Sequence, residues 1–415
     1  MIHNPKRAAE LKQGKQRWYD YYAGYSYSFT KSAITSANLP EDALVLDPWN
    51  GAGTTTLVSS QQGFSSIGLD LNPVMTIIAK AKQSSMEDLE KAVRDSLSLS
   101  ARYKPQAQED DPLLVWMDTL SVQSVRKIEK FILKGKQYDS LLGKSESLSY
   151  CQCIQYIALF NAVRRFLTKF IPSNPTWIKK ATAEEDKISF TWSQIKDEFV
   201  LNVQLLNIDL SEQIRNENTA ESTLLVSSST SIPLSSESVD LVLSSPPYCT
   251  RIDYAIATLP ELSILAVHGN KEIKSIRKTL MGSTTVPKSV PEIPNFGTVC
   301  NTFLLDVKKH HSRASSTYYY KNFYQYFSDL FQSVKEISRV MKPESKCFLV
   351  VQDSHYKDIH CDLAKIIIDM FYMNDVEHVT SYDFESKNNM ANINPRGKVY
   401  RAKTSAVETV IEFKK

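Results

Sequence analysis

The residues best suited to chemistry stand together in the second half of the chain, as Ser245, Pro246, Pro247 and Tyr248. They follow residues 239–243, an apolar and β-branched run that predicts a buried strand. Two consecutive prolines end this strand, and the residue before a proline is held extended, which fixes the direction of the Ser245 hydroxyl and of the carbonyls beside it. A hydroxyl, rigid carbonyl acceptors and an aromatic ring suit a planar substrate with an exocyclic amine. Taken alone, the segment is equally typical of a strand that leads into a loop.

A glycine turn near the N-terminus is the second feature with chemical meaning. Residues 44–47 predict a strand, Gly51 and Gly53 a sharp bend, and Thr54 the first residue of a helix. Glycine lets a ligand approach the backbone closely, and a helix start offers free amide donors and a positive dipole end. A second strand ends at Asp70, and an acid about 20 residues beyond the first strand bonds ribose hydroxyls in nucleoside-binding α/β folds.

The charges around this turn favour one kind of nucleoside cofactor. The third glycine of the dinucleotide fingerprint is absent, and Asp47 stands at the strand end where a pyrophosphate would be repelled. A cofactor that combines an adenosine with an ammonium group, such as S-adenosylmethionine, suits Asp47 and Asp70 better. The aromatic residues between 18 and 29 fit either a wall of this pocket or plain core packing.

Composition indicates a globular protein with a large core. The chain has 415 residues, of which 42% are hydrophobic and 23% charged. It lacks an apolar run of the roughly 20 residues that a membrane span needs, and its first 20 residues contain no secretory signal, so we expect a cytoplasmic protein of a bacterial or archaeal cell. The cysteines have no paired metal-site spacing, so we expect reduced thiols and no metal; they are Cys151, Cys153, Cys249, Cys300, Cys347 and Cys361.

Three predicted regions organise the chain. Residues 1–84 hold the cofactor motifs and the first half of a catalytic domain, and residues 85–222 form a mainly helical insertion, with a helix at 153–170 and a short strand at 189–195. Residues 223–415 form the second half, with a basic loop or lid at about 267–317. The elements expected in this half are strands at 223–229, 346–352 and 376–381, helices at 318–340 and 363–373, and a last antiparallel strand within 400–413.

Net charge is only +3, but basic residues concentrate in 1–20, 267–321 and 396–415. Each of these stretches is also typical of ordinary solvated surface. Together they favour a basic rim around a polyanion.

With these motifs, the chain resembles the amino-methyltransferases of DNA, which methylate cytosine N4 or adenine N6. Residues 47–55 match the cofactor motif of that family, Asp70 its ribose acid, residues 245–248 its catalytic motif, and residues 22–26 its additional cofactor motif. The resemblance covers residues 18–82 and 223–413. It implies a class I methyltransferase (Rossmann-like) α/β fold, with a seven-stranded, mostly parallel sheet, helices on both faces, and S-adenosylmethionine at the strand carboxyl ends.

The resemblance implies catalytic and cofactor-binding roles for the residues at the matching positions. The implied catalytic residues are Ser245, Pro246, Pro247 and Tyr248. The implied cofactor-binding residues are Tyr25, Ser26, Asp47, Pro48, Asn50, Gly51, Gly53, Thr54, Thr55, Asp70, Leu71, Asn72 and Ser228. One departure is that serine, near Ser228, replaces the acid expected after the third strand to contact the adenine ring.

The implied reaction is direct methyl transfer to a base flipped out of double-stranded DNA, without a covalent enzyme intermediate or a metal. In this family, serine at the first catalytic position accompanies cytosine N4 more often than adenine N6, so cytosine N4 is the favoured target. Adenine N6, an RNA amino group, and a non-catalytic nucleic-acid-binding protein on the same fold are the alternatives. A restriction nuclease or defence partner is also implied. Target recognition can belong to either 85–222 or 267–317, and the oligomeric state stays open.

Overall fold

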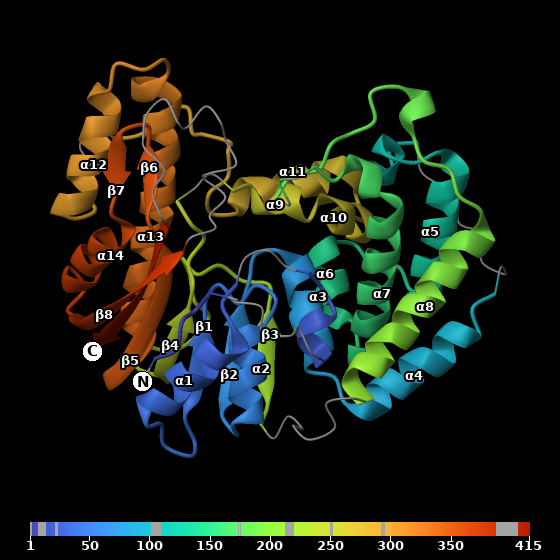
Figure 1. Ribbon diagram of the computed structural model, residues 1–415, viewed down its shortest axis with the longest axis horizontal. Helices are drawn as coiled ribbons and strands as arrows, with labels where there is room; N and C mark the ends of the chain where they lie inside the picture. The colour runs from blue at the N-terminus through green and yellow to red at the C-terminus, as the bar shows by residue number, and fades with distance from the viewer. Residues whose placement is uncertain are drawn as a thin grey trace.

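The computed structural model describes residues 2–6, 14–20, 24–100, 109–172, 174, 176–211, 220–249, 252–291, 295–386 and 406–415. Its central element is one seven-stranded sheet with strand order β3-β2-β1-β4-β5-β9-β8 (Figure 1). The strands are β1 (Leu44–Asp47), β2 (Ser65–Leu69), β3 (Ser222–Leu225), β4 (Val239–Ser244), β5 (Met341–Gln352), β8 (Glu377–Ser386) and β9 (Ala406–Lys414).

All neighbouring strands are parallel except that β9 runs antiparallel to both β5 and β8. The seven-stranded, mostly parallel fold expected from the sequence is therefore confirmed, and so is the antiparallel last strand. The chain runs outward from β1 through β2 to β3 and then crosses to β4 on the other side of β1. The switch point of the sheet therefore lies between the carboxyl ends of β1 and β4, where such sheets bind ligands.

Helices cover both faces of the sheet. Val45 of β1 is buried with Phe29 of α1 (Tyr27–Ala37) and Val58 of α2 (Thr54–Gln61). Its neighbour Leu46 points to the opposite face and is buried with Phe327 of α13 (Tyr320–Val340) and residues of α14 (Leu363–Tyr372). Strands buried on both faces explain why β1 and β4 are apolar runs rather than alternating ones.

The described residues between β2 and β3 are mainly helical, with a mostly non-helical connection within 171–191, and in Figure 1 most of these helices stand to the right of the sheet. The helices are α3 (Pro73–Lys82), α4 (Met86–Leu97), α5 (Thr119–Ile132), α6 (Leu141–Ser147), α7 (Tyr150–Phe166) and α8 (Trp192–Ser211). Helix α7 is the central one, because it packs against α3, α4, α5 and α8. The expectation of a strand at 189–195 is wrong: Thr191 and Gln194 cap each other's backbone N–H groups, and this reciprocal cap begins α8.

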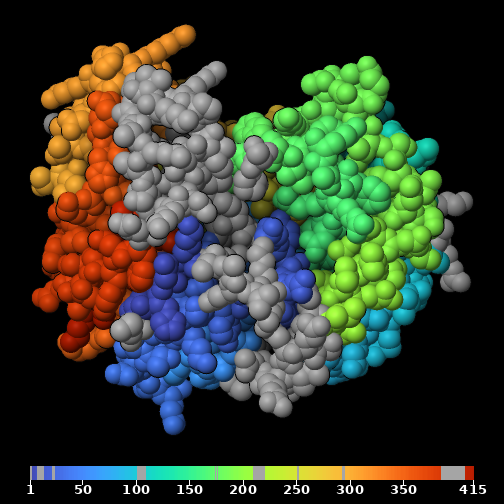
Figure 2. Space-filling model, in the orientation of Figure 1, coloured from blue at the N-terminus to red at the C-terminus, as the bar shows by residue number. Residues whose placement is uncertain are grey.

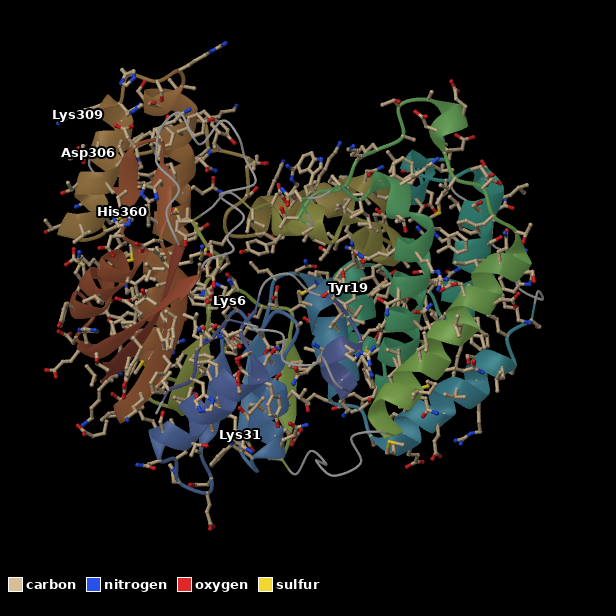
Figure 3. All side chains as sticks on the ribbon, in the orientation of Figure 1. Lys6, Tyr19, Lys31, Asp306, Lys309 and His360 are labelled. Carbon is tan, nitrogen blue, oxygen red and sulfur yellow. The ribbon has the colours of Figure 1, made fainter. Side chains whose placement is uncertain are left out.

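The segment after residues 245–248 also contains more helix than expected. It holds α9 (Tyr254–Ala257), α10 (Leu259–Leu265), α11 (Gly269–Thr279) and α12 (Thr298–Lys309), so the expectation of a loop over 267–317 is wrong for α11 and α12. Glu261 of α10 pairs with Arg164 of α7, whose guanidinium also lies over the ring of Tyr19, labelled in Figure 3. Helix α10 is thereby fixed to the helical insertion.

The remaining elements are short. The hairpin β6 (Ser354–Tyr356) and β7 (Ile359–Cys361) stands beside α12. The single-turn helices are η1 (Gly14–Arg17), η2 (Pro112–Val115), η3 (Thr168–Phe170), η4 (Glu184–Asp186) and η5 (Ser315–Tyr319). Figure 2 shows a notch at the top of the molecule, between the orange segment around α12 and the green helical segment, and Figure 1 shows α9 and α11 crossing between these two halves. Within the described ranges, no helix has the length and apolar character needed to cross a membrane.

Candidate cofactor pocket and catalytic loop

The carboxyl ends of β1, β2, β3 and β4 converge on one pocket. Most of the residues that the sequence assigns to a site line it together: Tyr25, Asp47, Pro48, Asn50, Gly51, Thr54, Asp70, Leu71, Asn72, Ser228, Ser245, Pro246, Pro247 and Tyr248. Ser26, Gly53 and Thr55 do not line it. Tyr22 and Ala23 lie outside the described residues.

Asp47 is the polar centre of the pocket floor. Its side chain is only 2% exposed, and burial raises the pKa of its carboxyl. Four donors oppose that rise: the hydroxyls of Thr55 (2.5 Å), Ser244 (2.5 Å) and Tyr25 (3.0 Å), and the amide of Trp49 (3.1 Å). Asp47 therefore joins the first strand to the segments on either side, and its oxygens are largely used by the protein itself.

Asp70 is held differently, because the groups that bind its carboxylate among the described residues all belong to the main chain. One carboxylate oxygen accepts from the amide of Gly51 at 3.0 Å and the other from the amide of Asn72 at 2.8 Å. A carboxylate has about four acceptor positions, so the remaining ones are available to a ligand in the pocket. Burial raises the pKa of Asp70 to about 7, against the effect of these two hydrogen bonds. This arrangement can accept two neighbouring hydroxyls of a ribose.

The predicted residues that do not line the pocket hold its walls in place. Gly53 has φ +78°, and a Cβ there would lie 2.6 Å from the Cβ of Ala79 on α3, so glycine permits both the turn and the packing of two helices. The hydroxyl of Ser26 accepts from the amide of Phe29 and begins α1. Thr55 bonds Asp47 from the first turn of α2. These three residues lie behind the residues that line the cavity, and they hold those lining residues in position.

The loop at residues 245–248, which the sequence predicts to be catalytic and which is called the catalytic loop below, is fixed by hydrogen bonds to three distant elements. The Ser245 hydroxyl donates to the carbonyl of Val350 on β5, at 2.9 Å. The Tyr248 hydroxyl donates to Glu408 on β9, at 2.8 Å. From α13, the hydroxyl of Tyr326 donates to the carbonyl of Pro247, at 2.7 Å. The loop is thus a rigid, preorganised edge of the pocket rather than a free connection.

Two acids of this site, Glu408 and Asp329, are not predicted from the sequence. Glu408 lies within the last strand, and burial raises its pKa, whereas its hydrogen bond with Tyr248 and the charge of Lys6 (Figure 3) oppose that rise. Asp329 reaches the pocket from α13. The only sequence signal for Asp329 is its position three residues after Tyr326 and four before Ser333, on one face of a predicted helix.

The charge of the pocket decides which cofactors fit. Three carboxylates line it, from Asp47, Asp70 and Asp329, whereas no lysine or arginine is found among the described lining residues. Such a pocket repels a pyrophosphate and attracts a cation. A nucleoside with sulfonium and ammonium charges fits it, with Asp70 as the acceptor for the ribose hydroxyls.

The sheet order, the antiparallel strand β9 and the nucleoside pocket at the strand ends define a class I methyltransferase (Rossmann-like) fold. No family model matches the chain. The chain is similar to Type II methyltransferase M.MvaI of Kocuria varians, with 24% identity over 377 residues, 84% of this chain and 78% of that protein. It is 27% identical to Type II methyltransferase M.BsoBI of Geobacillus stearothermophilus over 314 residues, 68% of this chain but only 58% of that protein.

A third relative is Type II methyltransferase M.AvaI of a Nostoc species, 20% identical over 386 residues, which span 86% of this chain and 78% of that protein. Among solved structures, a SAM-dependent methyltransferase from Methanosarcina mazei aligns with a TM-score of 0.32 and 10% identity, over 92% of this chain and 96% of that one. The similarity to Type II methyltransferases supports a methyltransferase whose cofactor is S-adenosylmethionine.

Proposed function

We propose that this protein is a DNA methyltransferase that modifies an exocyclic base amine, with cytosine N4 as the target. The observation that carries the proposal is the hydrogen bond from the Ser245 hydroxyl to the Val350 carbonyl. Because the hydroxyl proton is committed to β5, the Ser245 oxygen offers only lone pairs to whatever enters the pocket. An amine needs such acceptors, and the Pro246 carbonyl is the second acceptor of the same loop. The similarity to three Type II methyltransferases supports DNA as the substrate.

The chain's own residues prepare the amine. An exocyclic amine is a poor nucleophile while its lone pair is conjugated with the ring. Acceptance of its two protons by Ser245 and by the Pro246 carbonyl favours a tetrahedral nitrogen, whose lone pair then points into the acid-lined pocket. When bound there, S-adenosylmethionine supplies an electrophilic methyl group. The nitrogen lone pair would form the new N–C bond as the S–C bond of the cofactor breaks, S-adenosylhomocysteine would leave as the neutral thioether, and the methylated nitrogen would lose one proton to water.

Tyr248 has the second role in this loop. Its ring can stack on a base that has left the duplex, which offsets part of the few kcal/mol that unstacking costs. Since Glu408 holds the Tyr248 hydroxyl, the ring plane is set before the base arrives. Asp70 holds the ribose of the cofactor, and Asp47 keeps the glycine turn and the catalytic loop in register.

A basic helix leads from the surface to this pocket. Lys271, Lys274 and Lys278 of α11 are exposed at spacings that place them on one face, whereas Glu272 turns away to bond the amides of Leu141, Val267 and His268. Helix α11 ends at Thr279, and the next residues, Leu280 and Met281, line the pocket. We assign this face to the phosphates that flank the target base. The helical insertion at 85–222 is then the candidate for reading the neighbouring sequence.

The choice of base rests on the resemblance rather than on geometry, because neutral acceptors fit the amines of cytosine and adenine equally well. Adenine N6 is therefore the second candidate target. Methylation of an RNA amino group and non-catalytic binding of nucleic acid are also compatible with the fold. A restriction nuclease partner is proposed only from the names of the relatives.

The test is transfer of labelled methyl from S-adenosylmethionine to unmethylated bacterial DNA, followed by digestion and nucleoside mass spectrometry. The variants are Ser245→Ala and Tyr248→Ala, with Ser98→Ala, an exposed position on the helical insertion, as the matched control. N4-methylcytosine that disappears in the first two variants alone supports the proposal. N6-methyladenine would change the base and keep the mechanism. Label only in RNA would indicate an RNA methyltransferase, and cofactor binding without any transfer would indicate a non-catalytic binding protein.

A further inference from the structure

Asp329 is the one pocket acid whose carboxylate has no hydrogen-bond or ion-pair partner among the described residues. It lies on α13, lines the same pocket as Asp47 and Asp70, and is half-buried. Burial raises the pKa of its carboxyl to about 6. Withdrawal of a carboxylate from water costs free energy unless a donor is provided, and a ligand that enters this pocket can provide one.

The neighbours of Asp329 on α13 define its place in the pocket. Three residues earlier, the Tyr326 hydroxyl donates to the Pro247 carbonyl, at 2.7 Å. Four residues later, the Ser333 hydroxyl shares a hydrogen bond of 2.9 Å with Ser229, in the turn after β3. Residues three and four apart lie on one face of a helix. Asp329 therefore lies between the catalytic loop and the turn that follows β3.

The strand order decides which part of a nucleoside cofactor reaches that place. The reactive methyl group must approach Ser245 at the end of β4, and the ribose is held by Asp70 at the end of β2. Strand β3 lies on the other side of β2 from β1 and β4. A purine ring attached to that ribose would then lie towards residues 227–230, which line the pocket with hydroxyl groups and no acid. Asp329 lines the same pocket one helical turn before Ser333, which bonds Ser229 of this turn.

The two remaining pocket acids are committed elsewhere. Asp47 accepts four hydrogen bonds from the protein, and Asp70 accepts two amides and faces the ribose. On the assumption of the proposed function, with S-adenosylmethionine as cofactor, the N–H donor at the purine end is the 6-amino group. We propose that Asp329 binds the 6-amino group of the cofactor's adenine ring, and that it gives the pocket its selectivity for adenosine over inosine.

The chemistry of this selectivity is a match of donors and acceptors. The carboxylate of Asp329 accepts an N–H from a 6-amino group. A 6-oxo group presents lone pairs to the same oxygens, so the acceptor is left unpaired and the two groups repel each other. Sites built to bond an N–H or O–H group discriminate strongly against the analogue that lacks it. Asp329 belongs to α13, about 100 residues after Ser228 in the sequence. It would supply the acidic contact to the adenine ring that the serine at position 228 does not provide.

The test measures binding rather than turnover. Dissociation constants of S-adenosylhomocysteine and S-inosylhomocysteine are measured by calorimetry for the wild type, Asp329→Ala and Asp329→Asn. The matched control is Asp306→Asn, at an exposed position on α12 that Figure 3 labels. The wild type and the control should prefer the 6-amino compound by about 10- to 100-fold. In Asp329→Ala this ratio should fall to near one. Asp329→Asn, which is nearly isosteric and carries an amide N–H, should regain affinity for the 6-oxo compound.

Two further outcomes separate the explanations. With 5′-methylthioadenosine, which lacks the amino-acid portion, the effect of Asp329→Ala should persist; its disappearance would mean that Asp329 binds the ammonium group, and would overturn the proposal. An unchanged 6-amino to 6-oxo ratio in both variants would overturn it as well. A wild type that binds neither homocysteine compound would contradict the proposed function itself, and this assignment with it.

Discussion

The hydroxyl of Tyr248 donates a 2.8 Å hydrogen bond to the Glu408 carboxylate, across 160 residues of sequence. This contact joins the catalytic loop to the antiparallel strand β9. If Tyr248 stacks on a flipped base, as proposed, its ring must be held in place before the base arrives, and we therefore propose Glu408 as a positioning residue for Tyr248.

We expect Glu408→Ala to lower kcat by roughly 10-fold or more, because a hydrogen bond to a charged group contributes about 1.5–3 kcal/mol. Glu408→Gln keeps an acceptor oxygen and should recover part of that loss. Binding of S-adenosylhomocysteine should not change in either variant. The readouts are kcat and the dissociation constant, with the exposed Glu344→Gln as control. If Glu408→Ala lowers kcat further in a Tyr248→Phe background, Glu408 acts by another route.

Asp70 predicts two opposite pH effects. Its pKa in the folded, ligand-free protein is raised to about 7 from the ordinary value of 3.8. Protonation thus favours the folded state, and the ligand-free protein should lose stability as pH rises from about 4 through about 7. Ribose hydroxyls need the ionised carboxylate, so affinity for S-adenosylhomocysteine should instead fall as pH drops below about 7, by up to about 10-fold per pH unit.

Melting temperature and calorimetric affinity between pH 5.5 and 8 test both effects. Asp70→Asn should flatten both profiles and bind more weakly throughout. Profiles that stay as steep in Asp70→Asn as in the wild type would assign the titration to another acid, of which Asp329 is the nearest in pKa.

Gly53 and Gly135 form a natural comparison for the cofactor turn. Both have φ near +75°, but a Cβ at Gly53 would meet Ala79 at 2.6 Å, whereas nothing lies within 4 Å of a Cβ at Gly135. We expect Gly135→Ala to cost about 1 kcal/mol through backbone strain alone. Gly53→Ala should cost about 1–3 kcal/mol more, because α2 and α3 must separate. Denaturant unfolding measures the difference; equal costs would contradict the close packing.

The exposed lysines of α11 predict a salt-dependent contribution to DNA affinity. Replacement of Lys271, Lys274 and Lys278 by alanine should weaken binding of duplexes of any sequence. It should also reduce the slope of log affinity against log salt by about one for each lost phosphate contact. Lys31→Ala on α1, labelled in Figure 3 at the opposite end of the view, is the control. The assignment fails if the salt slope is the same in the triple variant and in the wild type.

Much of the site could be predicted because its features are local. A glycine turn, an acid at a strand end and two prolines after an apolar strand each depend on a few neighbouring residues. Backbone restrictions therefore place Asp70 and Ser245 at strand ends, and parallel strands gather these ends at one edge of the sheet. For this reason most of the expected site residues line one pocket. Gly53 and Ser26 do not line it, but they stabilise the turn and the helix that form its walls.

The rest depends on contacts between distant segments. Val350 meets Ser245 because β5 pairs with β4, and Glu408 meets Tyr248 because β9 inserts antiparallel beside β5. Asp329 faces the pocket only because α13 packs with its Tyr326 and Ser333 against two different loops. Such contacts are set by strand register and by helix rotation against the sheet, and both are determined by packing of the whole core. The sequence alone therefore determined the turn, the strand ends and the tetrad, whereas tertiary packing decided which acids complete the site.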